Sequence, residues 1–227
     1  MTLEKIFRNL PKSAPQLHTL CIGVGGHSFQ YTGIGFSIHD DFLYDTERLQ
    51  CVELTKCKIS WDSRLLTGLT RLALEVSLNS NSSIIQVLHA LQRMPALTDL
   101  HLKDSIPDDS EGLSISPVFD LPCLRVLNIS SGVGPLTAVQ HHITFPHSAI
   151  LNLTCKENHS AQVDFSNFFL PSAKFLSSLV IRSLNLRVPD EIYPTGLEFY
   201  LSTTAFMDCF PYTSLLTLQS QLVRLMP

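Results

Sequence analysis

The chain lacks an apolar run that could cross a membrane, since no window approaches the roughly 18 uninterrupted apolar residues of a spanning helix. Its start, MTLEKIFRNLPKSAP, lacks the apolar core of a signal peptide. Basic runs are also missing, and 16 Lys and Arg against 20 Asp and Glu give a net charge of −4. We therefore expect an intracellular protein, cytoplasmic or nuclear, that binds neither membranes nor nucleic acid.

Metal and disulfide patterns are missing too. The six cysteines form no C-x-x-C pair and no compact framework, which is typical of reduced thiols. A local group of possible ligands matches none of the zinc spacings; it comprises His141, His142, His147, Cys155 and His159. We therefore predict no metal site.

Catalytic signatures are equally scarce, because no G-x-S-x-G, P-loop or H-E-x-x-H motif occurs. The glycine-rich stretch at residues 22–36 lacks the third glycine of a dinucleotide-binding loop and no helical pattern follows it. A turn-rich insertion is the simpler interpretation. The sequence therefore predicts no enzyme and no cofactor.

What the chain does have is a repeat, L-x-x-L-x-L. It starts at Leu17, Leu49, Leu69, Leu97, Leu124, Ser148 and Leu176, with the first position degenerate at Ser148. The starts lie on average about 26 residues apart, within the roughly 20–29-residue period of leucine-rich repeats. Segments near Leu197 and Leu216 resemble further units, but neither fits the register cleanly.

A second periodicity separates the expected strands from what precedes them. Proline lies two residues before the motif in four units, at Pro15, Pro95, Pro122 and Pro146, where it ends any preceding helix. Apolar spacing predicts helices over residues 3–10 and 84–91, the second capped by Ser82. Shorter helices are expected around Leu136 and Val139 and around residues 165–169.

These patterns predict an α/β fold, a leucine-rich repeat solenoid in which a curved parallel sheet carries helices and loops on its convex side. We expect a single domain over residues 1–227 with about seven to nine irregular repeats. The repeats are clear over residues 3–185, whereas the register is uncertain over 186–227.

In such a solenoid, the strand residues between the inward positions face the concave side. They are polar or charged here, which predicts an extended protein-binding surface; the alternative is the merely soluble face of a sheet. The expected contact residues are Glu53, Arg71, Glu75, Asp99, His101, Lys103, Asn128, Asn152 and Arg182.

Three runs carry a resemblance to a known family: LQCVELTKCKISWDSRLLTGLTRLALEVS, IIQVLHALQRMPALTDLHLKDSIP and VFDLPCLRVLNISSGVGPLTAVQHHITFP. They resemble the leucine-rich region of the F-box proteins of mushroom-forming (basidiomycete) fungi. The resemblance covers roughly residues 3 to 185, and its most specific part is CKISWDSRLLTGLT.

The resemblance implies a non-enzymatic protein–protein interaction module, the substrate-recognition repeats of a Skp–cullin–F-box ubiquitin ligase. In that family an N-terminal F-box binds the Skp adaptor, and the repeats choose the protein to be ubiquitinated. The F-box start pattern, L-P-x-E followed by a hydrophobic residue, is missing from LEKIFRNLPKSAP. Skp binding is therefore expected only if an F-box lies upstream, and a standalone repeat scaffold without a ligase role is the alternative.

Overall fold

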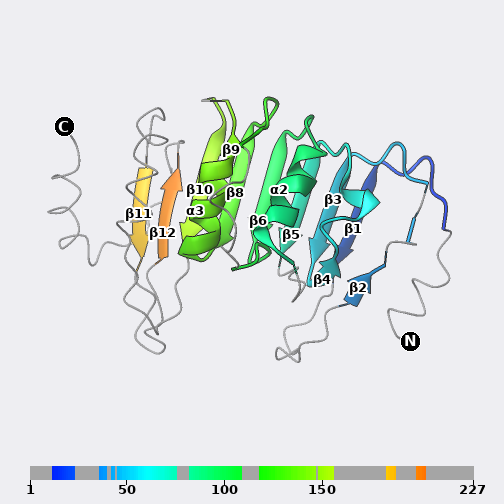
Figure 1. Ribbon diagram of the computed structural model, residues 1–227, viewed down its shortest axis with the longest axis horizontal. Coiled ribbons are helices and arrows are strands. Elements are labelled where there is room, and N and C mark those ends of the chain that lie inside the picture. Colours follow the sequence, from blue (N-terminus) through cyan, green and yellow to red (C-terminus); the bar gives the residue numbers. More distant parts are fainter. Residues whose placement is uncertain are drawn as a thin grey trace, which may run out of the picture.

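The computed structural model describes residues 12–23, 36–39, 42–43, 45–75, 82–108, 118–146, 148–155, 183–187 and 198–202. The side chains of Phe36 and Cys155 and of the last two ranges are not described. The chain is α/β, built on an eight-stranded sheet (Figure 1).

Six strands of this sheet are parallel to one another. In spatial order they are β1 (Thr19–Gly23), β3 (Cys51–Thr55), β5 (Arg71–Glu75), β6 (Asp99–Lys103), β8 (Val126–Ser131) and β10 (Ile150–Cys155). Among these six strands, chain order and spatial order agree, so each pairs with the next of the six along the sequence, as the repeat pattern predicts.

The described helices that connect these strands lie on one side of the sheet (Figure 1). They are α2 (Ile84–Gln92) and α3 (Val133–His142), and the 3₁₀ turn η1 (Arg64–Leu66) precedes β5. Two short parallel ladders accompany them: β2 (Phe36–Ile38) with β4 (Cys57–Ile59), and β7 (Phe119–Asp120) with β9 (Ile143–Thr144). The sequence pattern did not predict these ladders.

The core lies between the sheet and these connections. The inward strand residues are at most 2% exposed: Val52, Leu54, Leu72, Leu74, Leu100, Leu102, Leu127, Ile129, Leu151 and Leu153. They belong to one cluster with the buried face of α2, which includes Val87, Leu88 and Leu91. The predicted inward positions are thus confirmed in β3, β5, β6, β8 and β10. In the edge strand β1, Leu20 and Ile22 are only partly buried.

A hydrogen-bonded turn precedes β1, β3, β6 and β8. It is closed by a bond from the first motif residue to the carbonyl three residues earlier, for example from Leu97 N to Met94 O at 3.0 Å. Pro15, Pro95 and Pro122 occupy the second position of their turns, where a fixed φ near −65° is already suitable. Pro146 instead begins its turn, because Ala149 N bonds to its carbonyl.

The helix predicted over residues 84–91 is confirmed as α2, but its predicted cap was wrong by one residue. Ser83 is the N-cap: its Oγ accepts from Gln86 N, while Gln86 Oε1 accepts from Ser83 N at 3.1 Å. This reciprocal capping box requires Ser and Gln three residues apart, and Ser82 has no such partner. The short helix around Leu136 and Val139 is also confirmed, as α3.

The parallel order ends at β10. The next strand in the sheet is β12 (Glu198–Ser202), which pairs with β10 antiparallel, followed by β11 (Ser183–Arg187) antiparallel to β12. The segment near Leu197 therefore does form a strand, but it does not continue the parallel repeat. The predicted helices over residues 3–10 and 165–169 and the unit starting at Leu176 lie outside the described residues.

Leu100→Ala tests the packing that holds the strands in register. Leu100 is fully buried in a central strand, so its truncation should lower the free energy of unfolding by about 2–5 kcal/mol. Gln92→Ala, on the exposed side of α2, should change it by less than about 0.5 kcal/mol. Urea denaturation followed by circular dichroism measures both; equal midpoints would contradict the assignment.

Candidate functional site

The side of the sheet opposite the helices, here named the open face, displays three rows of side chains. The strand register aligns the central row as Cys21, Glu53, Ala73, His101, Asn128 and Asn152. The upstream row holds Thr19, Cys51, Arg71, Asp99, Val126 and Ile150, and the downstream row holds Gly23, Thr55, Glu75, Lys103, Ser130 and Thr154.

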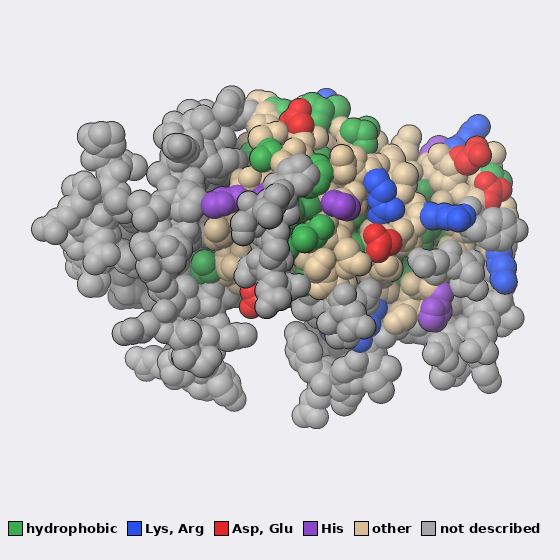
Figure 2. All heavy atoms as spheres, in the orientation of Figure 1, with side chains coloured by type: hydrophobic (Ala, Val, Ile, Leu, Met, Phe, Trp, Pro, Cys, Tyr) green, Lys and Arg blue, Asp and Glu red, His purple; other side chains and the backbone are tan. Residues whose placement is uncertain are grey.

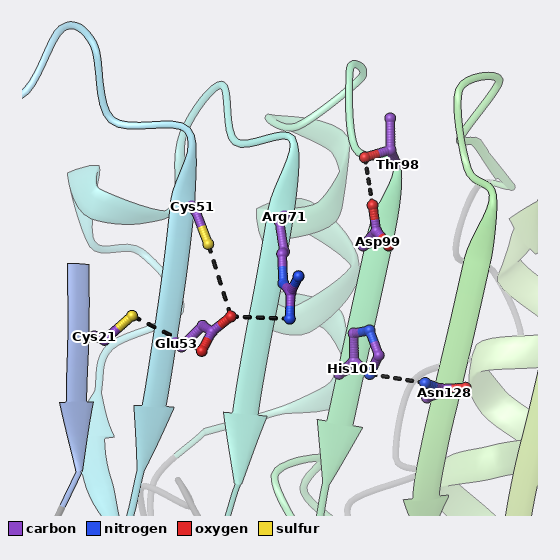
Figure 3. A network of polar contacts seen from close by, with 8 residues as sticks. All are labelled: Cys21, Cys51, Glu53, Arg71, Thr98, Asp99, His101 and Asn128. Carbon is purple, nitrogen blue, oxygen red and sulfur yellow. Dashed lines mark hydrogen bonds and ion pairs between the residues drawn. The ribbon is translucent and has the colours of Figure 1, made fainter. Parts of the chain in front are cut away.

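Two ion pairs cross this face. Arg71 Nη2 lies 3.0 Å from Glu53 Oε1 (Figure 3). Lys103 Nζ pairs with Glu75 Oε1 on the adjacent strand. The four side chains remain 39–54% exposed, so each pair contributes less than about 1 kcal/mol to stability. Their main effect is to fix the positions of the charges that the face presents.

Glu53 also orients two thiols. Cys21 Sγ lies 3.8 Å from one carboxylate oxygen and Cys51 Sγ lies 3.9 Å from the other (Figure 3). Burial and the Glu53 charge raise the pKa of both thiols above the ordinary value, although the Arg71 charge acts in the opposite direction. Because the thiolate is the reactive form, this environment does not activate either cysteine as a nucleophile.

A ladder of polar side chains joins β10, β8 and β6. Asn152 Nδ2 donates to Asn128 Oδ1 at 2.6 Å, and the Asn128 nitrogen lies 2.8 Å from His101 Nδ1 (Figure 3 shows the second contact). Since the Asn128 oxygen already faces Asn152, its nitrogen is the donor to His101, and His101 Nδ1 is the acceptor. The neutral imidazole then carries its proton on Nε2.

The surroundings of His101 oppose its protonation. Burial lowers its pKa first, the Arg71 charge lowers it further, and the carboxylates of Asp99 and Glu53 offset part of the effect. A second proton on Nδ1 would also face the Asn128 donor, so protonation of the ring disfavours the ladder in this arrangement of the amides.

An open hollow of about 480 Å³ lies over the central and downstream rows. Its lining includes Ala73, whose neighbours in the rows and along β5 are Glu53, His101, Arg71 and Glu75. Because alanine has only a methyl group, this position is lower than the long charged side chains around it. The hollow is therefore open to a side chain from another molecule.

The structure places nearly all of the predicted contact residues on this face. Glu53, Arg71, Glu75, Asp99, His101, Lys103, Asn128 and Asn152 all lie in the three rows, whereas Arg182 lies outside the described residues. Sequence reasoning missed Val126 and Ile150, which share the upstream row with Asp99. Residues two positions apart on a strand face the same side, so the positions of Asn128 and Asn152 also predict Val126 and Ile150 on this face.

The predicted lack of a metal site concerns a histidine-rich group that is only partly visible. Within the described ranges, no three His, Cys, Asp or Glu side chains form a grouping that could hold a metal ion. His141 and His142 end α3, whereas His147, His159 and the Cys155 side chain lie outside those ranges.

Figure 2 views the helix-covered side of the molecule. Among the coloured side chains of Figure 2, charges of both signs are interspersed, without a continuous basic area. None of the helices in the part of the chain that the structure describes is long and apolar enough to cross a membrane.

Comparisons with family models, with curated proteins and with solved structures returned no match for this chain. The candidate site is therefore defined by its own geometry.

His101→Gln tests the polar ladder through pH. Because the His101 pKa is lowered on folding, the unfolded chain binds more protons below the ordinary histidine pKa of 6.5, and stability is lost as pH falls below that value. The drop in melting temperature between pH 7.5 and pH 5 should therefore be smaller in His101→Gln than in the wild type. Comparison of the two proteins at pH 7.5 gives the pH-independent cost, and equal drops would contradict this role.

Proposed function

We propose that the chain is a leucine-rich repeat solenoid. The support comes from positions that are equivalent in different units. Lys56 and Asp104 each follow a strand with a positive φ, 56° and 49°, and each donates its N–H to the next strand, to Glu75 O and Ser130 O. Non-glycine residues rarely adopt this conformation, so its recurrence at one position indicates a shared unit.

The next residue in each unit gives further support. Cys57 and Ser105 occupy the N/C position of L-x-x-L-x-L-x-x-N/C-x-L. Each is buried, and each contacts the carbonyl two residues earlier, Thr55 O at 3.4 Å and Lys103 O at 2.9 Å. Each also reaches the preceding strand, at Ile22 O (3.8 Å) and Leu74 O (3.0 Å).

The function that we propose is that of a non-enzymatic protein–protein interaction module, with the open face as its contact surface. The observation that carries this proposal is the combination of ordered polar rows with the hollow over Ala73. A rigid sheet that presents side chains from five successive strands offers an extended surface, and preorganised side chains lower the entropic cost of binding a protein.

The resemblance of residues 3–185 to the repeats of fungal F-box proteins supports a more specific role. In that role the chain recognises the substrate of a Skp–cullin–F-box ubiquitin ligase inside the cell, in the cytoplasm or nucleus. The alternative is a standalone leucine-rich repeat scaffold with no ligase role, which would use the same face for assembly.

Ala73→Trp tests the contact surface. The indole would occupy the part of the hollow above position 73 without removing any buried group, so affinity capture of partner proteins from the cells that express this chain should fall by roughly tenfold or more. Gln92→Trp, on the exposed side of α2, is the matched control and should capture as the wild type does.

Combined alanine substitution of Arg71, His101 and Lys103 should weaken capture with an unchanged far-ultraviolet circular dichroism spectrum. Unchanged capture in both open-face variants would overturn the proposal.

The coding sequence upstream of Met1 tests whether the chain is part of a ligase receptor or a standalone scaffold. We expect the mapped 5′ end of the transcript to encode an F-box in frame, and the full product to retain the Skp adaptor in a pull-down. The chain of residues 1–227 alone serves as the negative control. A transcript without an F-box would favour the scaffold.

A further inference from the structure

This inference rests on the proposed binding function and concerns the chemistry of the partner. Among the described side chains of the open face, the charged ones lie on β3, β5 and β6: Glu53, Arg71, Glu75, Asp99 and Lys103. The corresponding positions of β8 and β10 are Val126, Asn128 and Ser130, and Ile150, Asn152 and Thr154. A charged part of the described face therefore lies beside a neutral part on β8 and β10.

The charged part contains one carboxylate that is not paired with a cation. Arg71 and Lys103 are paired with Glu53 and Glu75. Asp99 lies directly across from Arg71 in the register, yet its carboxylate accepts from the Thr98 hydroxyl at 2.6 Å, and no ion pair within the described residues includes it (Figure 3). Asp99 is only partly buried, so it can accept a cation from outside.

Two apolar residues continue the upstream row beyond Asp99. Val126 is partly buried, and Ile150 is 37% exposed, one of the few large apolar side chains of the described chain that face solvent. Neighbouring strands lie about 4.8 Å apart, so the midpoint between these two residues is about 7 Å from Asp99 along the row. Same-side residues of an extended chain are separated by nearly the same distance, about 6.6–6.8 Å.

The adjacent central row supplies groups for a peptide backbone. Counting the bonds among the described side chains, Asn152 has its side-chain oxygen left as an acceptor, and each of Asn128 and Asn152 has one amide N–H left. An extended peptide backbone presents N–H donors and C=O acceptors in alternation, and these amide groups can bond to both.

We propose that the open face binds an extended segment of a partner protein with the pattern Lys or Arg, any residue, then an apolar residue. The cation pairs with Asp99, the apolar side chain covers Val126 and Ile150, and the backbone bonds to Asn128 and Asn152. The segment crosses the strands from β6 to β10.

Selection of a randomised peptide library on the folded full chain tests this pattern. Enriched peptides should carry Lys or Arg two residues before an apolar residue, and Asp99→Asn should weaken their binding about tenfold or more, with the loss largest at low salt. Asp99→Lys should shift the enrichment to Asp and Glu. Asp120→Asn, on the helix-covered side, is the matched control and should bind as the wild type does.

The outcomes separate the inference from the function on which it rests. In one outcome, peptides bind the wild type, lose binding to Ala73→Trp and to Asn152→Ala, and show no preference for a cation. That result would overturn the inference and leave the binding function standing. Peptides whose binding is unaffected by every open-face variant would overturn both. Enrichment of acidic peptides on the wild type would overturn the inference alone.

Discussion

The interaction that the rest of the structure depends on is a backbone carbonyl that accepts two hydrogen bonds at the start of β3, β5, β6 and β8. His18 O accepts from both Gln50 N and Cys51 N, Gln50 O accepts from Thr70 N and Arg71 N, and Thr70 O and Thr98 O repeat the arrangement with the next strands. Two N–H groups on one acceptor fix the register of neighbouring strands. A slip by one residue would turn the buried leucines to solvent, so this register also fixes the rows of the open face.

The strand register therefore determines both the open face and the core. Alternation places Leu100 and Leu102 in the core and Asp99, His101 and Lys103 on the open face. Parallel pairing then brings equivalent residues of successive strands side by side at a spacing of about 4.8 Å. Groups far apart in the sequence, such as His101 and Asn128, become hydrogen-bonded neighbours without any loop having to position them.

The repeated and local features could be predicted from the sequence. The strands β3, β5, β6, β8 and β10, the helix α2 and most of the open-face residues follow from the apolar spacing, because burial of one face dictates it. The ladders β2–β4 and β7–β9 could not be predicted, because two- and three-residue strands leave no periodicity. Antiparallel β12 could not be predicted either, since strand direction depends on a connection rather than on alternation. Arg71 pairs with Glu53 and not with Asp99, because the pairing depends on side-chain geometry that the spacing of residues does not encode.

The connections differ in length while the strands do not. Paired residues are 32 positions apart between β1 and β3 (Thr19 and Cys51), 20 between β3 and β5 (Cys51 and Arg71) and 28 between β5 and β6 (Arg71 and Asp99). All of these lengths lead to the same alignment across the sheet. Since longer loops cost little closure entropy, insertions and deletions on the helix side can accumulate without displacing a single open-face side chain. The two sides of the molecule can therefore evolve at different rates, one by changes of length and the other by substitution alone.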